Sequence, residues 1–241
     1  MRRKLTAAVL AAGIALSAGC AQTPPPVSGK VQEYYDENIA NAKATLAPAA
    51  APAQKVVFLG DSYTFGSGAS SMQLRWSSIV ARNLSWGEIN IGVGDTGYSN
   101  PGTNAGGTTY DERVAKVVAS KPAIVVVSGG RYDVVQRDAQ VLVNAVATTF
   151  KDIRRALPKA RIVALSPVWD ASAPPAELAA VAEDVRSAVG SVGGTYIDVG
   201  QPLMQHPEAI SADGVHPNDA GHKLLADATV KALTKAGIEA G

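Results

Sequence analysis

The feature that most constrains the fold of this chain is a repeated alternation between short apolar runs and longer amphipathic stretches. Continuous apolar runs such as KVVFL at 55–59 and AIVVV at 123–127 are typical of parallel strands buried on both faces. Further strands are predicted at 88–91, 161–165 and 195–199, and helices at 72–84, 110–120, 138–157, 174–192 and 217–236. Five strands that alternate with helices predict an α/β fold, a three-layer α/β/α sandwich with a five-stranded parallel sheet.

Polar segments stand where these strands end. GDSYTFG at 60–66, NIGVGDTGYSNPG at 90–102 and SGGRYDVV at 128–135 each follow a predicted strand, and SADGVHPND at 211–219 precedes the last helix. Functional groups of parallel sheets gather at the carboxyl ends of the strands, so we expect the functional site there. We also expect Pro217 in the first turn of the closing helix.

The first and last of these segments hold a candidate nucleophile and a candidate base. Ser62 follows a Gly-Asp pair just after a buried strand, and Asp213 precedes His216 by three residues. A serine hydroxyl needs a base within hydrogen-bond reach, and a third group must orient that base. His216 can be this base, and Asp213 can hold its ring. His206 is predicted in a loop, and His222 as a surface or cap residue of the closing helix.

Together, the blocks GDSYTFG and DGVHPN resemble those of the GDSL/SGNH hydrolase superfamily, and the resemblance spans about residues 55–236. It implies a flavodoxin-like fold and hydrolysis of carboxylic esters by a triad of Ser62, His216 and Asp213. It implies no metal and no organic cofactor. The NxGxxxxGY loop and the SGGR run look most like the secreted actinobacterial branch of the superfamily.

One part of the family pattern is altered, namely the oxyanion hole. The family uses the N–H of the nucleophile, a glycine N–H and an asparagine side chain. The resemblance places the first at Ser62 and the second at Gly94 or Asp95, but Tyr132 stands where the asparagine is expected. A phenol can also donate a hydrogen bond. Tyr132 is therefore either the third donor or a gap in the hole, and losing one such donor typically costs about 10²–10³ in rate.

Several neighbouring residues have two interpretations at this stage. Asp133 is expected to brace its loop rather than to act in catalysis. Trp169 and Asp170 either line a substrate pocket or merely pack, and Arg131 either binds an anionic group or lies in solvent. The G-x-G-x-x-G at 92–97 is not a dinucleotide motif, because the YSNPG that follows it breaks any helix.

The substrate is expected to be a small-molecule, lipid or envelope-glycan ester. The alternative is a weak or inactive envelope lipoprotein that binds glycan or lipid.

The amino terminus has the pattern of an export signal. Arg2, Arg3 and Lys4 precede an apolar stretch at 5–16, and LSAGC ends at the single cysteine. We predict a signal peptide at 1–19. The arrangement resembles a bacterial lipoprotein signal with Cys20 as the lipidated residue, and ordinary secretory cleavage is the alternative. Residues 20–54 are predicted to be a Pro/Ala-rich linker, and 55–241 the hydrolase domain.

Charge and composition exclude some classes of binding partner and some kinds of site. Lys and Arg number 22 against 21 Asp and Glu, which argues against a nucleic-acid-binding protein. Cleavage after residue 19 would leave 19 basic residues against those 21, so a membrane would hold the protein through its lipid anchor only. One cysteine and three histidines argue against disulfide scaffolds and Cys- or His-rich metal sites. We expect an exported monomer anchored on the extracytoplasmic face of the cell membrane.

Overall fold

The structure is a computed structural model that describes residues 54–103, 107–135 and 138–239. The predictions for the signal peptide, for Cys20 and for the linker up to residue 53 lie outside these ranges. Within them, no helix is long and apolar enough to cross a membrane.

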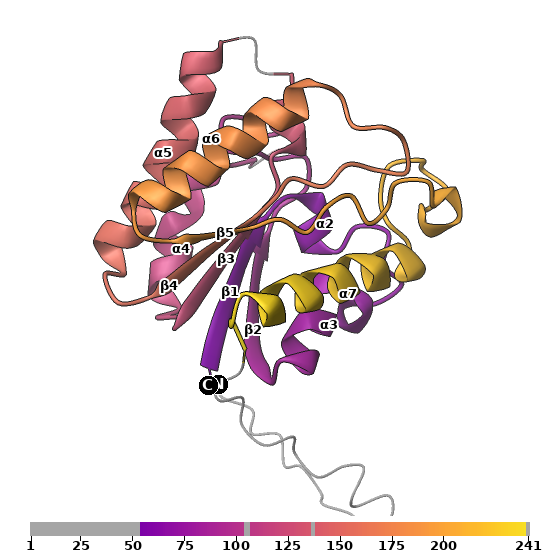
Figure 1. Cartoon of the computed structure of the whole chain (residues 1–241), viewed down its shortest axis with the longest axis horizontal. Coiled ribbons are helices and arrows are strands. Elements are labelled where there is room, and N and C mark those ends of the chain that lie inside the picture. Colours follow the sequence, from indigo (N-terminus) through magenta and orange to yellow (C-terminus); the bar gives the residue numbers. More distant parts are fainter. Residues whose placement is uncertain (1–53, 104–106, 136–137, 240–241) are drawn as a thin grey trace, which may run out of the picture. The chain divides into compact units, whose positions relative to one another are not determined.

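The sheet has five parallel strands, as predicted, and their order is β2-β1-β3-β4-β5 (Figure 1). Gly60, the last residue of β1, is level with Gly92 of β2 and Ser128 of β3. The loops that leave these three strands therefore start side by side. The strands are β1 Gln54–Gly60, β2 Trp86–Gly92, β3 Ile124–Ser128, β4 Arg161–Leu165 and β5 Thr195–Ile197.

Helices cover both faces of the sheet, which confirms the three-layer prediction (Figure 1). One face carries α3 and α7, which pack on Val56 and Phe58 of β1, and the other carries α4, α5 and α6, which pack on Val57 and Leu59. Neighbouring β1 residues thus feed two separate cores, as expected of a strand buried on both sides. The helices are α3 Trp76–Asn83, α4 Val114–Ala119, α5 Ala139–Ala156, α6 Glu177–Ser191 and α7 Asp219–Lys235.

Three local predictions are wrong. The helix predicted at 72–84 is split into a 3₁₀ turn at Met72–Leu74 and α3, because Arg75 between them is extended (φ −68°, ψ 150°). The strand predicted at 195–199 ends at residue 197. Pro217 is not in the first turn of α7, because the Asn218 side chain caps the helix by accepting hydrogen bonds from Ala220 N and Gly221 N.

His222 is buried rather than at the surface, which corrects another prediction. Its Nδ1 accepts a hydrogen bond from Trp76 N (3.3 Å), and its Nε2 lies 3.1 Å from the carbonyl oxygen of Ser67. The residue has no exposed surface because it lies on the buried face of α7 with Leu225 and Ala226. Burial lowers the pKa of His222 to about 4.

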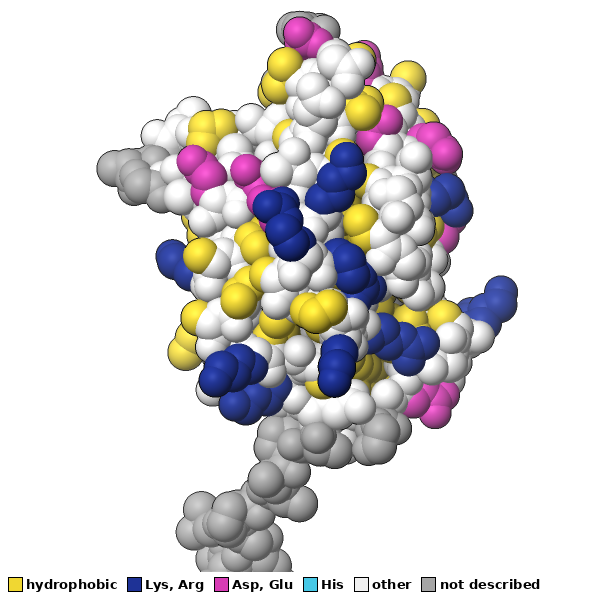
Figure 2. All heavy atoms as spheres, turned by 90° about the vertical axis from the view of Figure 1, so that its left-hand side faces the viewer, with side chains coloured by type: hydrophobic (Ala, Val, Ile, Leu, Met, Phe, Trp, Pro, Cys, Tyr) yellow, Lys and Arg dark blue, Asp and Glu magenta, His cyan; other side chains and the backbone are white. Residues whose placement is uncertain are grey.

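Charge is unevenly distributed over the face that carries α4 and α5. Figure 2 shows that its Lys and Arg side chains lie mainly over the middle and lower part, toward the end where β1 begins, and its acidic side chains mainly toward the top. Exposed basic residues at or just beyond the carboxyl ends of α4 and α5 include Lys116, Lys121, Lys151 and Arg155. The carboxyl ends of the strands, where the site is expected, lie at the opposite end of the sheet.

Candidate active site

Ser62 is the first residue of a four-residue helix, α2 Ser62–Phe65, which the sequence analysis did not predict. Asp61 caps this helix by accepting a hydrogen bond from Tyr63 N (3.0 Å). The strand-to-helix turn leaves no room for a side chain at Gly60, where a Cβ atom would lie 2.3 Å from the Ser128 carbonyl oxygen. The turn holds Ser62 at the carboxyl edge of the sheet, where its exposed fraction is 1%.

Asp213 and His216 form a compact motif in the loop before α7. Asp213 Oδ2 lies 2.7 Å from His216 Nδ1, and Asp213 Oδ1 accepts from Val215 N and His216 N at 2.9 Å each. These hydrogen bonds, first that from His216 N and then that from its ring, lower the pKa of Asp213. Asp219 stands three residues before His222 in the same way, but its carboxylate accepts from Ser70 instead.

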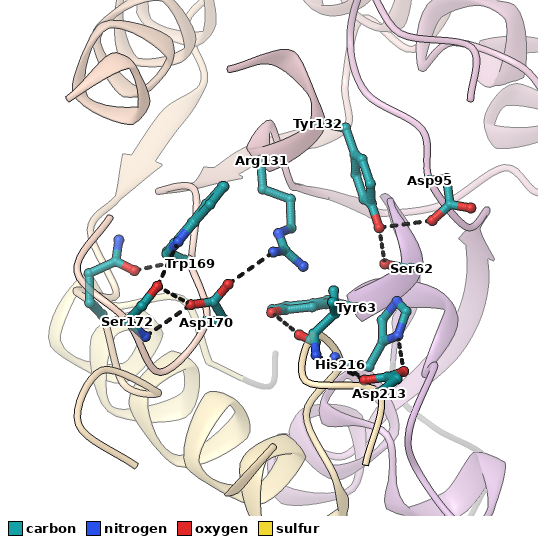
Figure 3. Close-up of polar contacts among 12 residues, drawn as sticks. Ser62, Tyr63, Asp95, Arg131, Tyr132, Trp169, Asp170, Ser172, Asp213 and His216 are labelled. Carbon is teal, nitrogen blue, oxygen red and sulfur yellow. Dashed lines mark hydrogen bonds and ion pairs between the residues drawn. The ribbon is translucent and has the colours of Figure 1, made fainter. Parts of the chain in front are cut away.

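Ser62 lies beside this motif, and the ring of His216 lies between Ser62 and Asp213 (Figure 3). The hydrogen bond that Ser62 Oγ makes is to Tyr132 Oη, at 3.2 Å. His216 Nε2 is buried and has no hydrogen-bond partner among the described residues. The structure therefore brings the predicted serine, histidine and aspartate together, with the histidine nitrogen nearest the serine still unpaired.

Tyr132 reaches the site from a 3₁₀ turn, Arg131–Asp133, that follows β3. Its hydroxyl donates to Asp95 Oδ1 at 2.9 Å as well as contacting Ser62. Burial raises the pKa of Tyr132 to about 12, so it is a neutral phenol at physiological pH. Asp95 lies with Gly94 in the turn after β2 and has a left-handed backbone (φ 60°). The sequence indicates a role for the backbone N–H of Asp95, and the structure also brings the Asp95 carboxylate into the site.

Arg131 does not lie in solvent, so that interpretation is wrong. The residue is 8% exposed because its guanidinium lies over the rings of Tyr63 (4.7 Å) and Trp169 (4.9 Å). Its Nη2 pairs with Asp170 Oδ2 at 3.4 Å, and its Nη1 is buried with no hydrogen-bond partner among the described residues. Trp169 packs against this group, and its indole N–H donates to Ser172 Oγ.

Asp133 braces its loop, as predicted. Its carboxylate accepts from Tyr98 N (2.9 Å), and from Ser99 N and Ser99 Oγ (2.8 Å each). Gly97 permits this close approach, because a Cβ there would lie 2.3 Å from Asp133 Oδ2. The hydrogen bonds tie the turn that carries Tyr132 to the loop that carries Asp95.

Two residues that position the site were not singled out from the sequence. Arg113 is fully buried, and its Nη1 donates to the carbonyl oxygens of Gly60 (2.8 Å) and Ile91 (2.7 Å), at the ends of β1 and β2. Tyr63 donates its hydroxyl to the carbonyl oxygen of Val215, next to His216 (2.7 Å). Arg113 lies in a stretch that the sequence pattern marks only as helix, and Tyr63 lies in the GDSYTFG block, where the pattern does not distinguish it from its neighbours.

A hollow of about 360 Å³ opens between the loop after β4 and the loop before α7. Its lining includes the acidic residue Asp170 and the hydroxyl-bearing residues Ser172 and Ser211. The complete lining is Asp170, Ala171, Ser172, Pro207, Ile210, Ser211 and Gly214. Among the described residues, no three His, Cys, Asp or Glu side chains are grouped so that they could hold a metal ion.

Comparison with known proteins gives consistent matches. The model of the GDSL-like lipase/acylhydrolase family matches residues 58–224. GDSL lipase Rv0518 of Mycobacterium tuberculosis is 32% identical over 185 residues, which cover 71% of this chain and 78% of the relative. Among solved structures, a family two carbohydrate esterase from Clostridium thermocellum in complex with cellohexaose matches 77% of this chain and 65% of its own, with a TM-score of 0.61 and 22% identity. Est24, a carbohydrate acetylesterase from Sinorhizobium meliloti, matches 76% of this chain and 99% of its own, with a TM-score of 0.59 and 15% identity. At these identities the two structures show a shared fold.

Proposed function

We propose that this chain, which belongs to the GDSL-like lipase/acylhydrolase family and hydrolyses esters, is a serine esterase. Ser62 Oγ attacks the ester carbonyl carbon, and its proton passes to His216 Nε2. Asp213 holds the ring through Nδ1 and stabilises the imidazolium that forms. The observation that carries this proposal is the 2.7 Å contact between Asp213 and His216 Nδ1, with Nε2 unpaired on the side of the ring near Ser62.

The remaining steps follow from the same groups. The negative charge on the carbonyl oxygen is stabilised by the N–H of Ser62 and by a backbone N–H of Gly94 or Asp95. His216 then gives its proton to the leaving alcohol, and the acyl group stays on Ser62. Water attacks this acyl-enzyme with His216 again as base, which releases the acid and restores the Ser62 hydroxyl.

The alcohol part of the substrate is proposed to be rich in hydroxyl groups, as an acylated sugar is. The leaving alcohol receives its proton from His216, so it must lie near the loop that carries this histidine. That loop borders the hollow lined by Asp170, Ser172 and Ser211, whose oxygens suit a neutral polar group. Two structures of similar fold are of carbohydrate esterases, which agrees with this choice. Lipid and other small esters are the competing substrates.

A second candidate function is an inactive protein of the same fold that binds glycan or lipid at this site. It is favoured by one observation, that Ser62 is 1% exposed and hydrogen-bonded to Tyr132 rather than to His216.

Hydrolysis of p-nitrophenyl acetate and of an acetylated sugar separates these two functions. The wild-type chain is expected to hydrolyse both, and Ser62→Ala neither. Ser191→Ala makes the same chemical change in an exposed residue at the end of α6 and should match the wild type. Equal rates for the wild type and Ser62→Ala would overturn the esterase and favour the binding protein.

We also propose that the protein is a monomer and belongs to the actinobacterial branch of the superfamily. We propose further that it is exported and that Cys20 carries a lipid anchor on the extracytoplasmic face. The support is the basic and apolar sequence that ends in LSAGC. Cys20→Ala should move the protein from the membrane fraction to the soluble fraction while the specific esterase activity stays the same. Retention of Cys20→Ala in the membrane fraction would contradict the lipid anchor.

A further inference from the structure

The hydrogen bond between Ser62 and Tyr132 has a direction that the surrounding groups determine. Tyr132 has one hydroxyl proton, which it donates to Asp95 Oδ1 (2.9 Å). An ionised carboxylate only accepts hydrogen bonds. In the 3.2 Å contact between Ser62 Oγ and Tyr132 Oη, Ser62 is therefore the donor. The proton that must reach His216 during catalysis points at a phenol oxygen instead.

His216 lacks the hydrogen bond that Ser62 could give it. Its Nδ1 is bonded to Asp213, whereas its Nε2 is buried without a partner among the described residues. A buried nitrogen that lacks a hydrogen bond raises the free energy of the resting state. The natural partner is the Ser62 hydroxyl, which lies beside the ring in Figure 3 but is directed to Tyr132.

The backbone around Tyr132 is fixed, so a change of partner needs only a side-chain rotation. Asn100 Nδ2 donates to the carbonyl oxygen of Tyr132 (3.1 Å), and Asp133 binds the N–H groups of Tyr98 and Ser99. These contacts hold the Tyr132 turn against the loop that follows Asp95. Tyr132 itself is partly exposed, so its ring borders solvent.

We propose that Asp95 and Tyr132 form a latch that keeps Ser62 turned away from His216 until an ester enters the site. The latch rests on the proposed function, because it matters only if Ser62 is the nucleophile. The entering ester displaces the Tyr132 hydroxyl from Ser62, and the Ser62 hydroxyl then donates to His216 Nε2. Tyr132 keeps its own proton throughout. Tyr132 and Asp95 are thus positioning residues, and the base is His216.

The latch has a kinetic signature that an oxyanion donor does not have. Opening it opposes substrate binding, because only the open fraction of the protein is competent to bind. Removing the latch therefore lowers KM and leaves kcat nearly unchanged. Losing an oxyanion donor would instead lower kcat, since that donor acts on charge that develops in the transition state.

The test is steady-state hydrolysis of p-nitrophenyl acetate by the full chain, with the rate of Ser62→Ala subtracted as background. Tyr132→Phe should lower KM by about threefold to tenfold, the effect of one net hydrogen bond, with kcat changed by less than about twofold. Asp95→Ala should lower KM less, because Tyr132 can still contact Ser62. Asp95→Asn keeps an acceptor oxygen and should lower KM least. Tyr196→Phe in β5 is the matched control and should leave KM at the wild-type value.

The outcomes separate the latch from the function on which it rests. A lower kcat with unchanged KM in Tyr132→Phe, or no change in either constant, would overturn the latch while Ser62-dependent turnover kept the esterase. Ser62-dependent turnover by Tyr132→Phe but not by the wild type would also overturn the latch, because the latch predicts nearly equal kcat values for the two proteins. Absence of such turnover from both proteins would overturn the esterase and the latch with it.

Discussion

The two sides of the candidate site are built in different ways. Asp213 and His216 are three residues apart in one loop, and Asp213 keeps half of its side-chain surface exposed. Ser62 and Tyr132 are 70 residues apart, and Tyr132 and Asp95 are 37 apart; the level ends of β1, β2 and β3 bring them together. The difference indicates that a local motif can supply the proposed base and the carboxylate that contacts it, whereas the position of the proposed nucleophile depends on the packed sheet. Substitutions on the local side should mainly affect catalysis, and those on the long-range side, which holds Ser62, Tyr132 and Asp95, should also affect folding.

The largest effect is expected at Asp213. Asp213→Asn should lower kcat for p-nitrophenyl acetate by about 10⁴-fold, because an amide no longer holds the His216 ring in the productive tautomer. The free energy of unfolding should fall by only about 1 kcal/mol, since the residue is exposed and asparagine keeps an acceptor oxygen for the N–H groups of Val215 and His216. Asp198→Asn, an exposed aspartate after β5, is the matched control and should retain wild-type activity. Equal activity of Asp213→Asn and the wild type would remove Asp213 from the mechanism.

Asp133 ties together the loops of the long-range side, so its substitution should mainly lower stability, whereas that of Asp213 mainly lowers activity. Asp133→Ala leaves the buried N–H of Tyr98 and the N–H of Ser99 without their acceptor, which should lower the free energy of unfolding by about 4 kcal/mol. Urea denaturation measures this loss. Asp227→Ala breaks only an exposed ion pair with Lys223 on α7 and should cost less than about 1 kcal/mol. Equal losses in the two variants would show that the hydrogen bonds to Asp133 do not stabilise the fold.

Asp61, next to Ser62 on the long-range side, makes the free energy of unfolding depend on pH. Burial raises its pKa to about 6, partly offset by the charge of Arg131, so the folded protein holds this proton more tightly than the unfolded chain. The stability that Asp61 contributes is therefore present below about pH 4 and is lost as the pH rises through 6. Relative to Asp61→Asn, the free energy of unfolding of the wild type should fall by about 2 kcal/mol between pH 4 and pH 7. A constant difference between the two proteins over this range would show that Asp61 does not titrate as described.

His222 should make the free energy of unfolding change with pH in the opposite direction over nearly the same pH range. Its pKa is lowered to about 4 by burial, so the unfolded chain takes up a proton before the folded protein does. Its contribution to stability is full above about pH 6.5 and is lost as the pH falls toward 4. Relative to His222→Gln, the free energy of unfolding of the wild type should fall by up to about 3 kcal/mol from pH 7 to pH 4. An increase instead would mean that His222 is charged in the folded protein.

The difference between the two sides also explains how much the sequence predicts. The sheet and its flanking helices follow from apolar periodicity, which long elements carry clearly. The four residues of α2 are too few to show a period, and the split at Arg75 depends on one backbone conformation. Asp213 and His216 are recognisable because they are neighbours in the chain. The Asp95 carboxylate, the buried Arg113 and the burial of His222 depend on which elements pack together, and no local pattern indicates this.

Covalent labelling shows whether Ser62 is the nucleophile. The purified chain is treated with a fluorophosphonate probe, digested, and mapped by mass spectrometry, with His216→Ala treated in parallel. We expect one label, on the peptide that contains Ser62, and a large loss of labelling in His216→Ala because the base is gone. A label on Ser128 or Ser211, or no label on protein that hydrolyses p-nitrophenyl acetate, would contradict the assignment of Ser62 as the nucleophile.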